Sequence, residues 1–164
     1  MMNSGKRFGE FVELEIRALT HVSDSLNAEE SPTAQNGNRN DHAIGLGAMG
    51  LHSYFATHQI MYGDTESLDF TNIYFMLLRY YALKASNKIA KERGVTFTDF
   101  KKSEYADGSF FDRYLETFDH TPQTEKVAEL FKDIHIPTEE DWTQLRQDII
   151  EHGLYSTVLL AVAP

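Results

Sequence analysis

Residues 42–56 read His-Ala-Ile-Gly-Leu-Gly-Ala-Met-Gly-Leu-His-Ser-Tyr-Phe-Ala, a stretch whose three glycines are spaced as G-x-G-x-x-G. In a dinucleotide-binding loop, glycines at this spacing allow a tight turn and a close approach of the backbone to a pyrophosphate. That mechanism needs a strand before the loop, whereas the preceding run, Gln-Asn-Gly-Asn-Arg-Asn-Asp, has the composition of a loop. An acidic residue, Asp69, follows the third glycine after 19 positions, but in a turn that leads into a helix. Nucleotide binding by Gly45, Gly47 and Gly50 is therefore the weaker hypothesis for this stretch.

The spacing of apolar residues in the N-terminal half predicts helices on both sides of the glycines. Residues 9–26 are predicted to form an amphipathic helix, and its apolar positions are Phe11, Leu14, Ala18, Val22 and Leu26. Residues 27–42 are predicted to be a polar loop, because they combine Pro32 and Gly37 with several asparagines. A second helix is expected to begin near Gly45 to Gly47 and to end near Met61.

The longest predicted helix covers residues 69–93, where apolar and aromatic side chains occupy more than one face. Asp64 or Ser67 is expected to cap its N-terminus. Gly94 would supply the left-handed residue that follows its C-terminus. Burial on more than one side is expected for this helix.

The C-terminal part is predicted to hold three shorter helices and one strand. The helices are a short one at 109–115, one that runs from Pro122 to about Ile134 after Thr121 as N-cap, and one that begins after Thr138 and ends at Gly153. Residues 154–163 are rich in β-branched and apolar residues, which predicts a strand buried on both faces. This lone strand is expected to have no partner inside its own chain. Because its backbone groups must be satisfied, we expect its sheet to be completed by another polypeptide or by a continuation of this one.

The composition limits the classes of function. The 164 residues fit one domain, 41% of them are apolar, and no linker separates a second domain. A net charge of -10 disfavours nucleic acid as a partner, because a phosphate backbone would be repelled. No apolar run approaches the roughly 20 residues that cross a bilayer, and the first residues do not form a signal peptide. We therefore expect no membrane contact and a cytoplasmic location.

No group of residues predicts a catalytic or metal site. The chain has no cysteine, which excludes disulfides, thiolate ligands and a cysteine nucleophile. Its seven histidines include no pair at i, i+4 and no H-E-x-x-H motif, so no metal is expected. The acidic run Glu139-Glu140-Asp141 is interpreted as the first turn of a helix, where the helix dipole favours negative charge.

A series of segments resembles, in order, the large catalytic subunit of class I ribonucleotide reductase, and most closely its class Ib, NrdE-type branch. The segments are 17–24, 40–56, 62–64, 68–75, 85–90, 92–94, 103–114, 136–142, 153–155 and 160–164. Together they extend over nearly the whole chain from about Phe8. The ordered series is more specific than any one of its segments.

The resemblance implies that this mostly α-helical chain is part of the ten-stranded α/β barrel of that subunit. The parent enzyme makes deoxyribonucleotides for DNA synthesis through a cysteine thiyl radical and a redox-active cysteine pair, and this chain contains none of the three. The final run, Leu-Ala-Val-Ala-Pro, resembles the residues that precede the loop for the substrate diphosphate. Pro164 is therefore the one residue expected at the edge of the substrate site, and no catalytic residue is expected.

We therefore interpret residues 1–164 as an internal fragment of the barrel, with a helical segment at 9–153 and a strand at 154–163, inactive alone. The expected partners are flanking fragments of the same large subunit, as in a split, phage-like gene, and indirectly the small subunit that generates the radical at a dimetal site. No cofactor is expected in this chain, and the allosteric ATP or dNTP and the ribonucleoside diphosphate would bind only in the parent enzyme. The alternatives are a standalone helical interaction module, a relic without reductase function, or the nucleotide-binding protein considered above.

Overall fold

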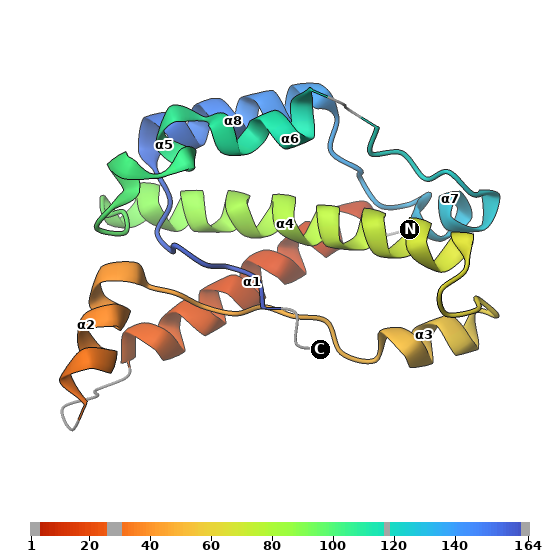
Figure 1. Ribbon diagram of the computed structural model, residues 1–164, viewed down its shortest axis with the longest axis horizontal. Coiled ribbons are helices and arrows are strands. Elements are labelled where there is room, and N and C mark those ends of the chain that lie inside the picture. The colour runs from red at the N-terminus through yellow and green to blue at the C-terminus, as the bar shows by residue number, and fades with distance from the viewer. Residues whose placement is uncertain (1–3, 26–30, 117–118, 162–164) are drawn as a thin grey trace.

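A computed structural model describes residues 4–25, 31–116 and 119–161, which are mostly helical, as predicted. Figure 1 shows the long helix α4 (Thr65–Arg93) in the middle, α1 (Ser4–Ser25) along one side of it, and α5, α6 and α8 along the other. Helices α2 and α3 lie at opposite ends of the molecule. The remaining bounds are α2 Pro32–Asp41, α3 Leu51–Thr57, η1 Phe100–Lys102, α5 Glu104–Asp107, η2 Ser109–Phe111, α6 Asp112–Leu115, α7 Glu125–Phe131 and α8 Glu139–His152.

Helix α4 organises the core because its side chains are buried on several faces. Ile73, Leu77 and Leu83 are completely buried, as expected for a helix that lies between two layers. Its ends follow the predicted capping. Asp64 accepts a hydrogen bond from the backbone N–H of Ser67 at 2.8 Å, and Gly94 ends the helix with a φ of 65°. The helix begins at Thr65, four residues before the predicted start.

Helix α1 is amphipathic, but the predicted apolar stripe is not the face that packs. The face toward α4 carries Val12 and Ile16, which are 3% and 0% exposed. The stripe residues Phe11, Leu14 and Val22 are instead 61%, 63% and 59% exposed. Helix α1 therefore has two apolar faces, and α4 covers only one of them.

Ion pairs line the edge between α1 and α4. The guanidinium of Arg17 donates two hydrogen bonds to Glu92, at 2.8 and 2.7 Å. Lys88 donates to Glu13 at 2.6 Å. Fork-to-fork pairing of Arg17 with a carboxylate sets the register of the two helices more strictly than a point charge would.

The polar loop predicted at 27–42 is wrong for residues 32–41, which form helix α2. Pro32 occupies the first turn, where its fixed φ suits a helix and its missing N–H costs nothing. The helix ends at Asp41 and is followed by His42, whose backbone is left-handed with a φ of 45°. The side chain of Asn38 bonds to both the hydroxyl and the carbonyl of Ser23 at the end of α1. A contact with another helix thus stabilises α2, and composition alone does not reveal such a contact.

Two other helices begin later than predicted. Helix α3 begins at Leu51 after Gly50, because residues 43–47 are extended and pair with the C-terminal segment. Helix α7 has Thr124 as its N-cap instead of Thr121, and Pro122 precedes the helix. In both cases a distant segment determines where the helix begins.

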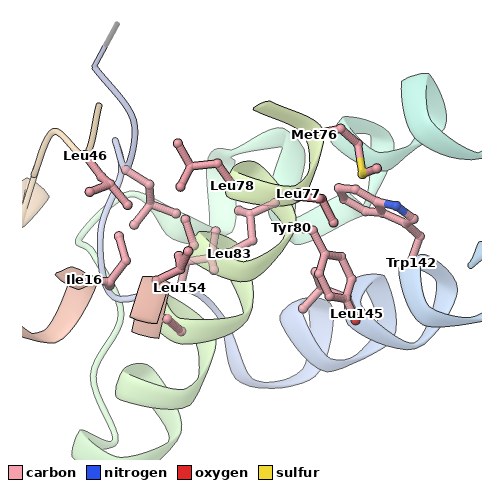
Figure 2. Close-up of a cluster of buried hydrophobic side chains, with 14 of the residues drawn as sticks. Ile16, Leu46, Met76, Leu77, Leu78, Tyr80, Leu83, Trp142, Leu145 and Leu154 are labelled. Carbon is pink, nitrogen blue, oxygen red and sulfur yellow. The ribbon is translucent and has the colours of Figure 1, made fainter. Parts of the chain in front are cut away.

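Helix α8 begins and ends where the sequence predicts. Thr138 and Asp141 form a capping box, and Gly153 follows the last turn. From this helix Trp142, fully buried, contacts Tyr80 of α4 in the cluster of Figure 2. The indole also stacks on Tyr114 with 4.3 Å between the ring centroids. Aromatic packing of this kind joins α8 to α4 and α6.

The C-terminal segment is extended, but it is not a strand of a sheet in the part of the chain that the structure describes. Its pairing there is an isolated parallel bridge between Leu46 and Leu160. The expectation that it has no partner inside its own chain is therefore wrong, because the extended residues before α3 supply one. Burial on both faces, predicted for 154–163, is correct for 154–156 but wrong at Val158, which is 51% exposed. Residues 162–163 lie outside the described residues. The segment therefore has one buried and one open face near its end.

Candidate functional site

Two extended segments run side by side near the end of the described chain. Residues 43–47 follow α2, and residues 157–161 lead toward Pro164, which itself lies outside the described residues. Four backbone hydrogen bonds join this region to the C-terminal segment: Thr157 N to Asp41 O at 2.9 Å, Ile44 N to Val158 O at 3.0 Å, Leu46 N to Leu159 O at 2.9 Å, and Ala161 N to Leu46 O at 3.0 Å. The direction is parallel, as in sheets whose faces are covered by helices.

Two glycines of the G-x-G-x-x-G pattern allow these segments to approach closely. A Cβ atom at Gly47 would lie 2.4 Å from the carbonyl oxygen of Ala161, and one at Gly45 would lie 2.7 Å from the Cβ of Ala161. The third glycine, Gly50, has a φ of 76° and precedes helix α3. Gly45 and Gly47 thus make room for another segment of this chain. That segment occupies the space in which the nucleotide-binding hypothesis would place a pyrophosphate.

Two polar residues of α4 hold the beginning of the C-terminal segment. The hydroxyl oxygen of Ser86 accepts hydrogen bonds from the backbone N–H groups of Tyr155 and Ser156, at 3.1 and 3.2 Å. The amide of Asn87 donates to the carbonyl of Gly153 at 2.8 Å. Ser86 and Asn87 are 0% and 3% exposed, so these bonds are shielded from water.

A cluster of four polar side chains ties the segment to the ends of three helices. Tyr155 donates its hydroxyl to Asp24 at 2.9 Å, and Arg93 pairs with the same carboxylate. The ring of Tyr155 lies between two neighbours, with His42 stacked at 4.1 Å and the Arg93 guanidinium at 4.5 Å. Burial, followed by the bond to Asp24, raises the pKa of the Tyr155 phenol, and the bond to Asp24 raises the pKa of Arg93. Tyr155 therefore acts as a neutral hydrogen-bond donor.

Asp69, the acidic residue that a dinucleotide-binding loop would use, is committed to its own chain. It is 8% exposed and accepts hydrogen bonds from the backbone N–H groups of Gln123 and Thr124 and from the Thr124 hydroxyl. The three distances are 3.0, 2.8 and 2.8 Å. These bonds fix the segment before α7, and this carboxylate is buried in its own chain instead of being open to a ribose.

The paired segments contain backbone amides and small or aliphatic side chains, and these groups can position a neighbouring residue but cannot transfer a proton. In the residues that the structure describes, no three His, Cys, Asp or Glu side chains gather as a metal site would require. The acidic run at 139–141 lies in the first turn of α8, as predicted. Among the described helices, none combines the length and the apolar character that crossing a bilayer requires.

Sequence reasoning missed the residues that hold the C-terminal segment. Ser86 and Asn87 stand in the middle of α4, where a buried polar pair between apolar residues is a usable signal. Asp24 and Tyr155 are 131 positions apart, and no local pattern connects them. The sequence analysis expected a helix to begin near Gly45 to Gly47, and it did not predict that these glycines make room for the C-terminal segment.

Comparison with known proteins identifies the family. Residues 2–164 match the barrel domain of ribonucleotide reductase. The chain is 46% identical to ribonucleoside-diphosphate reductase subunit alpha of Mycoplasma pneumoniae, in an alignment that covers 99% of this chain and 23% of that protein. For the subunit alpha of Bacillus subtilis the identity is 43%, over 93% of this chain and 22% of the relative. For the nrdEB subunit alpha of Bacillus phage SPbeta the identity is 39%, in an alignment that covers 98% of this chain and 15% of that protein.

The chain therefore spans less than a quarter of the length of these relatives. The resemblance that rests on ordered segments of the sequence is confirmed, and the helix-rich structure with one parallel bridge is that of a part of the barrel. Because the match to the barrel domain includes nearly every residue, the chain belongs to the ribonucleotide reductase family, within its barrel domain.

Proposed function

We propose that this chain completes the barrel of a ribonucleoside-diphosphate reductase large subunit and so contributes to the reduction of ribonucleotides to deoxyribonucleotides. The observation that carries the proposal is the match to the barrel domain over residues 2–164. The parallel pairing of 43–47 with 157–161 supports it, because parallel segments covered by helices are the building unit of an α/β barrel.

The role of the 164 residues is structural, and the chain alone is inactive. The reaction implied by the resemblance uses three cysteines, and the sequence contains none. The reacting groups therefore belong to flanking parts of the large subunit, to which this chain supplies helices and the two paired segments. The radical-generating small subunit and the nucleotide effectors act on those other parts, and the ribonucleoside diphosphate binds only in the assembled enzyme.

The contribution of this chain to the substrate site is positional. Ser86, Asn87 and the Asp24–Tyr155 bond hold the segment that leads to Pro164. A loop that binds a diphosphate through backbone amides needs a rigid approach, since each amide must point at the same small volume. We infer that these residues fix the direction in which the chain enters the substrate site, with Pro164 at its edge.

A replacement experiment tests the proposal. The matching region of the Bacillus subtilis subunit alpha is exchanged for this chain, and formation of deoxynucleotides is measured with the small subunit of that organism. An active chimera supports the proposed function, and the isolated 164-residue chain should show no activity. A folded but inactive chimera, together with a stable monomeric isolated chain, would instead favour the standalone module or the relic.

A further inference from the structure

The face of α1 that points away from α4 is apolar, exposed and flanked by acidic residues, and we propose that it docks an amphipathic helix with a basic rim from the rest of the reductase large chain. This inference rests on the proposed function and names a contact within it. We define the outer stripe of α1 as Phe11, Leu14, Ala18 and Val22.

The geometry of the outer stripe is that of a helix–helix contact. At 3.6 residues per turn, its four positions fall within an arc of about 80°, and they extend over roughly 17 Å of the helix. The buried residues Val12 and Ile16 lie almost opposite, against α4. A helix that is apolar on two opposite faces is typical of burial between two neighbours. Three large side chains about 60% exposed along one helix are more than the single exposed apolar residues that a surface normally carries.

The charged residues of α1 form two groups, one that pairs with α4 and one that lies beside the outer stripe. Glu13, Arg17 and Asp24 all pair with cations or carboxylates of α4. Glu10 and Glu15 are exposed, and by helical spacing they stand on either side of the outer stripe, while the exposed Arg7 lies one turn before Phe11 at its N-terminal end. Neither glutamate makes an ion pair within the residues that the structure describes. An acidic rim around an apolar stripe is complementary to an apolar stripe with lysine or arginine beside it.

These charges also favour a helix with a basic rim over a second copy of this chain as the partner of the outer stripe. A second copy of this chain would bring together two molecules that each carry a net charge of -10. A helix with a basic rim has no such repulsion. The relatives are more than four times as long as the matched region, and their additional sequence is the source that the proposed function provides for such a helix.

Photo-crosslinking in the chimera with the Bacillus subtilis subunit tests the contact. A benzophenone amino acid replaces Leu14, and the crosslinked peptide is located by mass spectrometry. We expect a crosslink to a helix outside the 164 residues that carries apolar residues beside lysine or arginine. The double charge reversal Glu10→Lys with Glu15→Lys should reduce the yield of this crosslink several-fold. The same amino acid at the exposed Lys102 is the control, and it should not reach that peptide.

The outcomes separate this inference from the proposed function. If the chimera is active but position 14 gives no crosslink, or one to a second copy, the docking proposal is overturned and the proposed function stands. If the chimera folds without activity, the proposed function fails, and the crosslinked peptide still decides the docking. If the chimera does not fold, the 164-residue chain is mixed with the remaining portions of the relative as separate polypeptides, and absence of the crosslink there overturns the docking proposal.

Discussion

The Tyr155 hydroxyl donates a 2.9 Å hydrogen bond to Asp24, and this bond joins the end of the first helix to the C-terminal segment. Because Asp24 also pairs with Arg93 at the end of α4, one carboxylate connects three elements. The bond holds the extended segment against the helices at the place where it begins.

Removal of this hydroxyl should weaken the fold modestly. The substitution Tyr155→Phe keeps the stacked ring and leaves Asp24 paired with Arg93, so only the hydrogen bond is lost. We expect the free energy of unfolding to fall by about 1 kcal/mol. Urea denaturation measures this change, and Tyr62→Phe, at a tyrosine that is 67% exposed, is the matched control. Equal effects of the two substitutions would contradict the role given to the Asp24 bond.

Loss of the buried carboxylate of Asp69 should destabilise the fold more than loss of the Tyr155 hydroxyl. Asp69→Asn replaces an acceptor of three hydrogen bonds with a group that can accept fewer, and backbone N–H groups of 123 and 124 lose a partner. We expect a loss of roughly 2 kcal/mol in the free energy of unfolding. Asp133→Asn, at an exposed position, should leave the urea midpoint unchanged. If Asp69→Asn leaves the free energy of unfolding unchanged, this carboxylate does not hold the segment before α7.

Two glycine substitutions should act in opposite directions. Gly47→Ala places a methyl group against the carbonyl of Ala161, so we expect a loss of about 1–3 kcal/mol and faster amide exchange at Ala161. Gly37→Ala adds a methyl group in open space within helix α2, and it should stabilise the chain by roughly 0.5–1 kcal/mol. Denaturation and hydrogen exchange of both variants test the close approach of the paired segments.

Stability should depend on pH through His120. Burial lowers the pKa of His120, although a hydrogen bond that its imidazole donates to the Tyr114 backbone and the charge of Asp119 act in the opposite direction. Between the lowered pKa and the unfolded value of about 6.5, the unfolded chain binds more protons than the folded one. The contribution of His120 to the free energy of unfolding is therefore fully present above the pKa of the unfolded chain. This contribution is lost as the pH falls below that pKa toward the lower pKa of the folded chain.

The pH effect of His120 is measured by comparing variants. Denaturation between about pH 5 and pH 7.5 spans the ordinary pKa of histidine. The wild-type chain should lose more stability over this range than His120→Gln. Parallel curves for the wild type and His120→Gln would contradict the cause given for the lowered pKa.

A titration with NAD or ATP should show no saturable binding. Asp69 is occupied by the residues before α7, and Gly45 and Gly47 face Ala161. Calorimetry on the whole chain makes this measurement directly. Saturable binding that Gly50→Ala abolishes would restore the nucleotide-binding hypothesis.

Local chemistry explains which elements could be predicted from the sequence. The caps at Asp64, Gly94, Thr138 and Gly153 depend on residues within one turn, and the structure has all four at the predicted places. The long helix α4 was predictable for the same reason, since its spacing of apolar residues is continuous.

The features that sequence reasoning missed depend on distant contacts. Helix α2 is polar and contains Gly37, and its stability comes from the bonds of Asn38 to Ser23. Thr124 caps α7 because Asp69, 55 positions earlier, holds it there. On α1, periodicity identified an apolar stripe but could not tell which of two apolar faces packs inside this chain.

The pairing of Leu46 with Leu160 also constrains the order of events during biosynthesis. At a translation rate of roughly 5–20 residues per second, the segment near Leu46 leaves the ribosome on the order of ten seconds before its partner is made. Helices α1 and α4 can form during that interval, because their contacts are available first. The glycine-rich segment remains an unpaired edge until residues 157–161 emerge, and a chaperone that binds extended apolar chain would find it in that interval.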